Sequence, residues 1–234
     1  MREQRNSVIK GTDMLIQHLE ASRAAMDRLI SSDVVSEVGR AVGLITAALR
    51  GGHALLVCGN GGSAADAMHI AGELVGRFLR ERRAINCICL ASNPAVLTAW
   101  ANDYSYDTVF ARQVEAYGSA GSVLLGVSTS GNSVNVVRAF EMAREIGIGT
   151  IAMTGAGGGR LAGLADVLLA MPSQETPIVQ QLHVCIYHHM CERIEDSLAT
   201  DMSNGSWGTQ PETGERAERK PDLEAPSRAP LASR

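Results

Sequence analysis

The fold of this 234-residue chain is decided by residues 54–74, which read ALLVCGNGGSAADAMHIAGEL. A short apolar segment, 54–57, runs into the glycine-rich turn Cys58-Gly59-Asn60-Gly61-Gly62-Ser63, and a helix-like pattern follows. Glycines let the backbone turn and approach a ligand closely, and free N–H groups at the start of a helix favour a negative charge. We call residues 58–63 the first cradle and expect it to bind an anion.

A second stretch has the same design. The apolar segment 122–127 leads into Ser128-Thr129-Ser130-Gly131-Asn132-Ser133, which we call the second cradle, and a helical pattern follows. Its hydroxyls add adjustable hydrogen-bond donors. Neither cradle has the spacing GxxxxGK[ST] or GxGxxG, so the pair favours a sugar phosphate over a nucleotide. A third glycine cluster, 155–159, has only Thr154 beside it to offer a hydroxyl and predicts a tight turn.

Apolar segments alternate with helical patterns along most of the chain. Strands are predicted at 54–57, 85–90, 122–127, 150–153 and 167–171, and helices at 63–79, 94–100, 108–117, 133–146 and 176–198. This order predicts an α/β fold of three layers, a central parallel five-stranded sheet with helices on both faces. Ligands of such sheets bind at the carboxyl ends of strands near a switch in strand order, where both cradles are expected.

The two ends of the chain differ from this core, which we place at 53–198. Residues 1–52 predict a pair of helices, broken around Ser31-Ser32-Asp33, that pack on the core and on neighbouring subunits. Residues 199–234 hold four of the seven prolines and few large apolar side chains. Such a segment buries too little surface to offset its ordering entropy, so we expect a disordered tail.

Composition narrows the classes of function. With 45% hydrophobic residues and a mean hydropathy of +0.02, the chain is expected to form one well-buried core. The net charge of −4 gives no electrostatic case for binding nucleic acid or an anionic membrane, and no apolar run is long enough for a membrane span. The polar start MREQRNS and five cysteines in apolar segments favour a cytoplasmic protein. The pair Cys87-Ile88-Cys89 predicts a buried strand rather than a metal site.

The helix that follows the first cradle carries His69 and Glu73. They are four residues apart and therefore share one face of the helix. An imidazole and a carboxylate at this spacing can share a metal ion or a substrate, and an exposed polar pair is the alternative. Arg77, one turn further, is expected either to reach the phosphate or to form a salt bridge with Glu73.

The last predicted helix carries a second group of candidate ligands. Gln180 and His188 are eight residues apart and reach a common ion only with awkward geometry, which a site completed by a neighbouring subunit would ease. His183 lies within one turn of Gln180 and is the competing ligand. Asn102-Asp103 falls in a polar break between two predicted helices, as a helix cap or as a substrate contact.

Together these motifs resemble the sugar isomerase (SIS) domain superfamily and, within it, the bacterial phosphoheptose isomerases. The resemblance runs from about residue 8 to residue 197. The two cradles identify the superfamily, whereas the pairs His69/Glu73 and Gln180/His188 identify the isomerase. The family converts sedoheptulose 7-phosphate to D-glycero-D-manno-heptose 7-phosphate by enediol acid/base chemistry, the first step of ADP- or GDP-heptose precursor biosynthesis. Two features depart from it: Gly72 stands where many members carry an acidic residue, and the tail has no counterpart.

The resemblance also implies residue roles. Glu73 and His188 are implied to be catalytic, as the base at carbon and the proton donor at oxygen. One zinc ion per subunit is implied at His69, Glu73, Gln180 and His188. Substrate contacts are implied for Asn60, Gly61, Gly62, Ser63, Asn102, Asp103, Ser128, Thr129, Ser130, Ser133 and Gln180. The family forms homotetramers with active sites between subunits.

Two other readings stay open at this point. A non-catalytic SIS protein of the replication-initiator-associating type acts through protein contacts, and it would be expected to lack the acid/base residues that are all present here. An SIS isomerase for another sugar phosphate would carry the same cradles, and the pocket motifs do not distinguish it.

Overall fold

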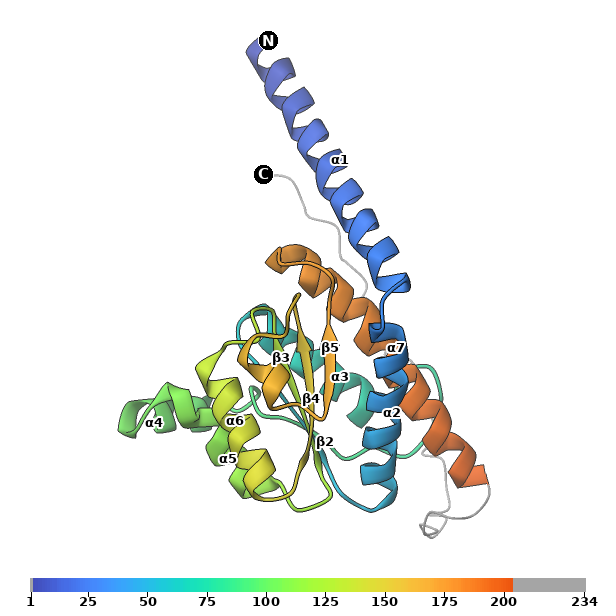
Figure 1. Cartoon of the computed structure of the whole chain (residues 1–234), viewed down its shortest axis with the longest axis vertical. Helices are drawn as coiled ribbons and strands as arrows, with labels where there is room; N and C mark the ends of the chain where they lie inside the picture. Colours follow the sequence, from blue (N-terminus) through green and yellow to red (C-terminus); the bar gives the residue numbers. More distant parts are fainter. Residues whose placement is uncertain (1, 204–234) are drawn as a thin grey trace, which may run out of the picture.

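The computed structural model describes residues 2–203, as helices on both faces of one sheet (Figure 1). The helices are α1 (Arg2–Ile30), α2 (Val34–Arg50), α3 (Gly62–Val75), α4 (Pro94–Asp103), α5 (Val109–Tyr117), α6 (Val134–Glu145) and α7 (Thr176–Ser203), with short 3-10 turns η1 (Tyr106–Thr108) and η2 (Gly159–Gly163). The strands are β1 (Leu55–Gly59), β2 (Cys87–Cys89), β3 (Val123–Ser128), β4 (Gly149–Thr154) and β5 (Val167–Ala170). All five predicted strands are present.

The sheet is parallel throughout, with the strand order β2-β1-β3-β4-β5. The chain runs from β1 to β2 on one side and then returns to place β3 on the other side of β1, so the order reverses between β1 and β3. Gly59 at the end of β1 pairs with Val127 of β3. The loops that leave these two strands, which are the two cradles, therefore emerge side by side at the switch point.

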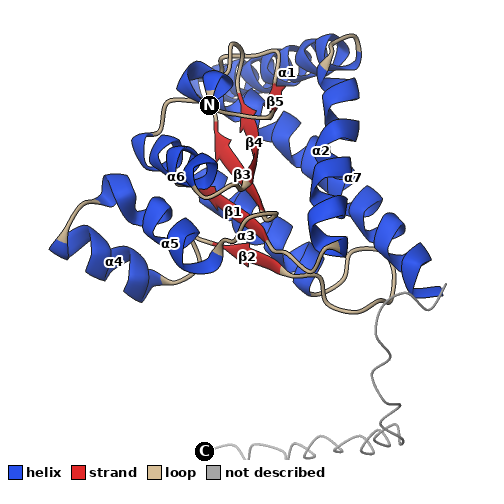
Figure 2. Cartoon of the chain, turned by 60° about the horizontal axis from the view of Figure 1, so that its bottom comes forward, coloured by secondary structure: helices blue, strands red, loops and turns tan. Residues whose placement is uncertain are grey.

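Helices cover both faces of the sheet (Figure 2). Successive strand residues point to opposite faces, so Leu55 and Val57 pack against α2, α3 and α7, while Leu56 and Cys58 pack against α5 and α6. This two-sided burial explains why the strands are continuously apolar rather than alternating. The expected three-layer α/β class is confirmed. Cys87 and Cys89 are buried core residues of β2, as expected.

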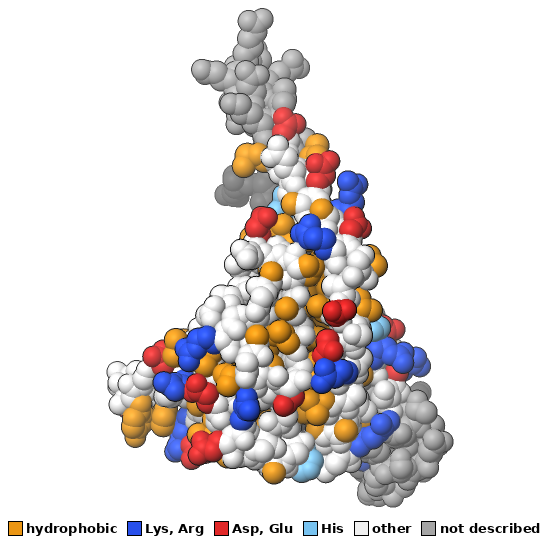
Figure 3. All heavy atoms as spheres, viewed as in Figure 1, with side chains coloured by type: hydrophobic (Ala, Val, Ile, Leu, Met, Phe, Trp, Pro, Cys, Tyr) orange, Lys and Arg blue, Asp and Glu red, His pale blue; other side chains and the backbone are white. Residues whose placement is uncertain are grey.

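The N-terminal helix pair is also present, and α1 projects away from the body (Figure 1). Five large apolar side chains on its described part are 48–69% exposed: Met14, Leu15, Ile16, Leu19 and Ile30. Figure 3 shows hydrophobic side chains along this segment and on the surface below it. Within the described residues, no helix is both long enough and apolar enough to cross a membrane.

Three helix ends differ from the prediction by at least three residues. The helix predicted at 94–100 continues to Asp103, so Asn102-Asp103 lies in its last turn rather than in a break between two helices. The helix predicted at 63–79 ends at Val75, because Gly76 follows and the next residues turn away toward β2. The last helix continues past Leu198 to Ser203, so the tail expected from residue 199 does not begin there. The rest of that expected tail, 204–234, lies outside the described residues.

Candidate active site

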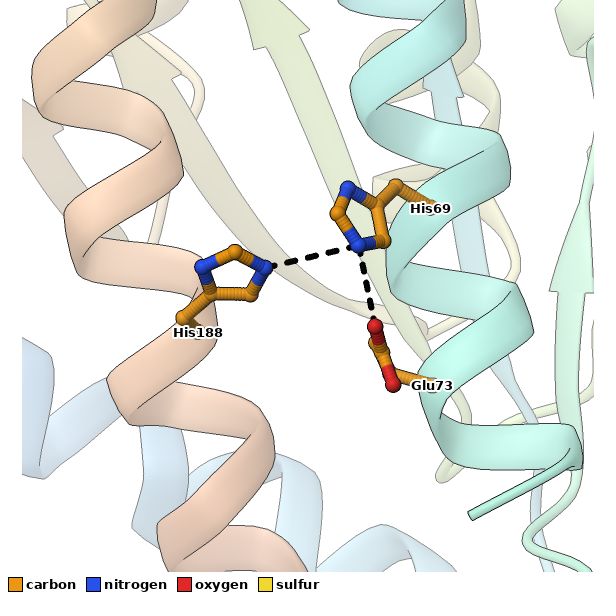
Figure 4. Close-up of side chains that lie close together, drawn as sticks. All are labelled: His69, Glu73 and His188. Carbon is orange, nitrogen blue, oxygen red and sulfur yellow. Dashed lines mark hydrogen bonds and ion pairs between the residues drawn. The ribbon is translucent and has the colours of Figure 1, made fainter. Parts of the chain in front are cut away.

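Two helices bring the acid/base candidates together (Figure 4). On α3, His69 Nε2 lies 2.9 Å from Glu73 Oε1, the contact expected from their spacing of four residues. On α7, which packs against α3, His188 places its Nε2 3.4 Å from the Nε2 of His69. Three potential ligand atoms, two imidazole nitrogens and one carboxylate oxygen, therefore lie within 4.8 Å of one another.

The other ring nitrogen of His69 is also held. The Tyr187 hydroxyl lies 2.9 Å from His69 Nδ1. Burial and the nearby Asp66 carboxyl raise the pKa of Tyr187 to about 12, so its hydroxyl stays protonated at neutral pH. Burial raises the pKa of Asp66, although His69 and the hydrogen bond from Tyr187 oppose that shift. The contact with Tyr187 holds the ring so that Nε2 faces Glu73 and His188.

This donor set fits a divalent ion such as zinc. Zinc takes imidazole nitrogen and carboxylate oxygen, and a ligating histidine normally hydrogen-bonds through its second nitrogen, as His69 does with Tyr187. The cluster is open to solvent on the single chain, since the side chains of His69 and Glu73 are 45% and 22% exposed. Room therefore remains for further ligands.

The fourth predicted metal ligand, Gln180, and its competitor, His183, occupy different places. Gln180 lies against the start of α3, so close that a Cβ on Gly62 would lie 2.3 Å from its Nε2. That contact places its amide beside the first cradle, about two turns of α3 from His69. His183, the competing ligand, is fully buried, and its Nε2 lies 3.2 Å from the carbonyl oxygen of Thr154. Its candidacy as a ligand was wrong, because the ring points into the core toward β4.

The second cradle collects hydroxyls at the start of α6. The Oγ atoms of Ser128 and Ser133 lie 3.0 Å apart, and Ser133 precedes α6 without capping it through its side chain. Ser130 is exposed and accepts a hydrogen bond from the Asn132 N–H. Hydroxyls and unpaired N–H groups at a helix start form a suitable place for a phosphate group.

A pair of asparagines joins the two cradles. Asn60 and Asn135 exchange hydrogen bonds of 2.8 and 2.9 Å between their side-chain amides. The hydroxyl of Tyr106 also donates to Asn60 Oδ1, at 3.0 Å. The first cradle is therefore fixed to the beginning of α6 across the switch point.

The third glycine cluster supports the second cradle from behind. The N–H of Gly155 donates to the carbonyl oxygen of Thr129 at 2.9 Å. Gly131 has a φ of +65°, and a Cβ there would lie 2.0 Å from the carbonyl oxygen of Gly158. The cluster packs as a turn against the cradle, which agrees with the predicted turn.

Asn102 and Asp103 are the last two residues of α4 and are exposed. The amide of Asn102 donates to the Asp103 carboxylate at 2.8 Å, and among the described residues neither side chain hydrogen-bonds to the cradles or to the His69 cluster. Arg77 pairs with Glu81 at 3.2 Å rather than with Glu73, because α3 has already ended. The predicted salt bridge to Glu73 was therefore wrong.

Known proteins of one family match this chain in sequence and in structure. The family model described as SIS domain matches residues 17–155. A phosphoheptose isomerase of Crocosphaera subtropica is 51% identical over 157 residues, which are 67% of this chain and 80% of that protein. The chain belongs to the phosphoheptose isomerase family of SIS-domain proteins. Solved phosphoheptose isomerases from Neisseria gonorrhoeae and Francisella tularensis superpose with TM-scores of 0.75 and 0.77, at 38% and 32% identity. They match 79% and 80% of this chain and 98% of their own chains.

The structural likeness to phosphoheptose isomerases reaches further than the family model does. The matched range 17–155 ends just after β4 and so contains His69 and Glu73 but not α7. His188 therefore joins the site through tertiary packing of α7 on α3. The position of Gly72 is open, since a Cβ there would meet nothing within 4 Å.

Sequence reasoning missed several residues that shape this site. Tyr187 holds His69, while Asn135 and Tyr106 hold Asn60. Tyr187 is next to a predicted ligand on the chain, which is the one available signal. The partners of Asn60 lie 75 and 46 positions away, and no spacing pattern connects them.

Proposed function

We propose that this protein is an aldose-ketose isomerase that converts sedoheptulose 7-phosphate to D-glycero-D-manno-heptose 7-phosphate, in the formation of activated heptose. The observation that carries the proposal is the meeting of Glu73, His69 and His188 beside two anion cradles. Family members are named for the isomerisation of a phosphoheptose. The sugar phosphate is the substrate partner.

The reaction moves one proton between C1 and C2 and another between their oxygens, through an enediol. Glu73 acts as the base at carbon, since its carboxylate stands at the cluster with one oxygen facing His69. His188 gives and takes the proton at oxygen. Acid/base groups of this kind contribute about 10² to 10⁴ in rate each.

The metal of the proposed site is zinc, held by His69, Glu73 and His188. The donor set and the Tyr187 hydrogen bond to His69 support this choice. Gln180, beside Gly62, serves as the fourth ligand or contacts the substrate. When bound, such an ion would polarise the substrate carbonyl and stabilise negative charge on its oxygen. With or without the ion, Tyr187 holds the ring of His69 in place, and His69 keeps Glu73 oriented.

The cradles hold the substrate by its phosphate. Ser63, Ser128, Thr129, Ser130 and Ser133 supply hydroxyls for the phosphate oxygens, while Asn60, Gly61, Gly62, Asn102 and Asp103 line the sugar. Binding of the phosphate, which does not react, orients the carbons that do.

The assembly is proposed to be a homotetramer with active sites between subunits. The open cluster and the exposed apolar side chains of α1 support it, because both leave surface that a second copy would cover. Sedimentation velocity of the purified protein measures the state directly. A monomer at micromolar concentration would contradict it.

The activity test uses purified protein and sedoheptulose 7-phosphate, with zinc supplied and the aldose product measured. Glu73→Gln keeps the shape of the side chain but removes the basic carboxylate, so turnover should fall by at least about 10²-fold. Glu115→Gln on α5, a carboxylate in a surface ion pair with Arg112, is the matched control and should leave turnover unchanged. Zinc content is measured for each variant, because the amide is also a poorer ligand.

The outcomes separate the alternatives. Activity on another ketose phosphate, and none on sedoheptulose 7-phosphate, would indicate an SIS isomerase of different specificity. Absence of activity on a whole panel of ketose phosphates would favour a protein that acts through protein contacts. Full activity of Glu73→Gln would place the base elsewhere, and Asp103 would be the next candidate.

A further inference from the structure

The segment between α3 and β2 is held by a buried ion pair outside the cluster of acid/base residues. Arg82 Nε donates to Glu195 Oε1 of α7 at 3.0 Å, and both side chains are only 1% exposed. A fully buried ion pair is expensive to desolvate and is weak support for stability by itself. The role of the ion pair is therefore inferred from the other contacts of Arg82 and Glu195.

Glu195 binds the backbone of the segment as well as Arg82. Its two carboxylate oxygens accept hydrogen bonds from the N–H groups of Phe78, Leu79 and Arg80 at 3.0, 2.8 and 3.0 Å. Burial raises the pKa of Glu195, but these three N–H groups and Arg82 outweigh it and hold the pKa below its ordinary value. The carboxylate thus fixes the chain directly after α3.

Arg82 binds the last turn of α3. Its Nη2 donates to the carbonyl oxygen of Glu73 at 2.8 Å, and its Nη1 donates to the carbonyl oxygen of Gly76 at 3.0 Å. The guanidinium therefore fixes the backbone of the residue that carries the proposed base. The planar fork of arginine makes these bonds and the bond to Glu195 at the same time, which an ammonium group does not do.

Glu195, the other residue of the ion pair, is connected to His188 through Phe78. Phe78, whose N–H is bound by Glu195, stacks its ring on the imidazole of His188, with centroids 5.6 Å apart and an interplanar angle of 16°. His188 and Glu195 are seven residues, about two turns, apart on α7 and so lie near one face of it. One buried ion pair is therefore connected to both acid/base residues.

We propose that Arg82 and Glu195 are positioning residues of the isomerase site, which set how Glu73 on α3 and His188 on α7 face each other. The inference rests on the proposed function for the roles of Glu73 and His188. It assigns no contact with substrate to either residue of the pair. Phe78 transmits the constraint from Glu195 to His188.

The test compares two arginines of the same segment. Arg82→Lys keeps the charge but loses the fork, so kcat should fall by about 10- to 100-fold, the cost typical of losing an outer partner or misplacing a reacting group. KM and the affinity for inorganic phosphate should stay unchanged, because the cradles belong to other loops. Arg80→Lys is the matched control, since Arg80 pairs with Asp196, the residue next to Glu195, but is 59% exposed. It should retain wild-type kcat.

A spectroscopic readout makes the test independent of turnover. In protein labelled with ¹³C in its histidine rings, Arg82→Lys should move the signals of His69 and His188 and leave the buried His183 in place. Phe78→Leu removes the stacked ring while keeping the ion pair, and it should move the His188 signal and lower kcat. This second variant decides the case if Arg82→Lys does not fold.

Each outcome has a separate meaning. Unchanged kcat and unchanged His188 signals in both variants would overturn the proposal and leave the pair a purely structural one. A parallel loss of kcat, phosphate affinity and all histidine signals would overturn it too, because the effect would then be a general loosening. A wild-type protein with no isomerase activity would contradict the proposed function, while the histidine signals would still decide whether the pair positions His188.

Discussion

The buried imidazole of His183 makes the stability of this protein depend on pH in a way that can be worked out in advance. The side chain is fully buried, with Nε2 against the carbonyl oxygen of Thr154. Its Nδ1 has no hydrogen-bond partner among the described residues. Burial lowers the pKa of His183 from 6.5 to about 4, although the bond to Thr154 opposes the shift.

The sign follows from proton uptake in the two states. As the pH falls below about 6.5, His183 in the unfolded chain becomes protonated while the folded protein keeps it neutral. The unfolded state then binds more protons, so the contribution of His183 to the free energy of unfolding decreases until the pH reaches about 4, and this contribution is constant below it. A difference between 6.5 and about 4, at about 1.4 kcal/mol per unit, gives a loss on the order of 3 kcal/mol.

The assay is urea unfolding at a series of pH values between 7.5 and 4.5, at one protein concentration because assembly would add to the measured stability. The variant His183→Asn keeps a donor for the Thr154 carbonyl but does not titrate. The wild type should lose more stability than the variant between neutral pH and pH 5. Equal losses in the two proteins would refute the buried, neutral imidazole.

The same variant tests whether His183 takes part in catalysis. Because its ring faces β4 rather than the cluster, His183→Asn should retain kcat at neutral pH. A loss of activity comparable to that of Glu73→Gln would make His183 a catalytic candidate.

Two further predictions concern the second cradle. Ser133→Ala should weaken binding of inorganic phosphate in calorimetry by about 1.5 to 3 kcal/mol, one charge-assisted hydrogen bond, whereas Ser119→Ala, whose hydroxyl contacts His53 and Ser122, should not. Unchanged affinity in Ser133→Ala would make the loop a simple turn. Gly131→Ala should abolish phosphate binding, because its Cβ would collide with Gly158. Gly157 also has a positive φ, +85°, but a Cβ there meets nothing within 4 Å, so Gly157→Ala should bind phosphate better than Gly131→Ala; equal loss would assign the effect to backbone strain alone.

The fold was largely predictable because its signals are local. Continuous apolar segments such as 123–127 and turns rich in glycine after them indicate buried parallel strands and helix starts without knowledge of the rest of the chain. The main error, a helix continued to residue 79, has a local cause, Gly76 at the end of α3, and a non-local one. Glu195 binds the N–H groups of Phe78, Leu79 and Arg80, and it lies more than 110 positions along the chain.

The site residues also divide into those predictable from local spacing and those that depend on tertiary packing. His69 and Glu73 were found together because their spacing alone places them on one face of α3. The packing of α7 on α3 decided which residue of that helix joins them, and it selected His188 while turning His183 into the core. A helix with three histidines among seven residues offers several faces, and only the tertiary contacts choose one.

The start and the length of α3 determine the distance between the proposed phosphate site and the proposed acid/base residues. Ser63 at the first cradle and His69 at the cluster are six residues apart, about 9 Å along the helix axis. A phosphate held at the start of the helix and a carbonyl beside His69 would thus belong to opposite ends of one extended molecule. Sedoheptulose 7-phosphate carries its phosphate and its reacting carbons at opposite ends, so in the proposed site phosphate binding in the cradle would contribute remote binding energy that orients C1 and C2 beside Glu73 and His188. The rigidity of α3 would then be part of the specificity, and the contacts of Arg82 at its last turn would act on the end proposed for the chemistry.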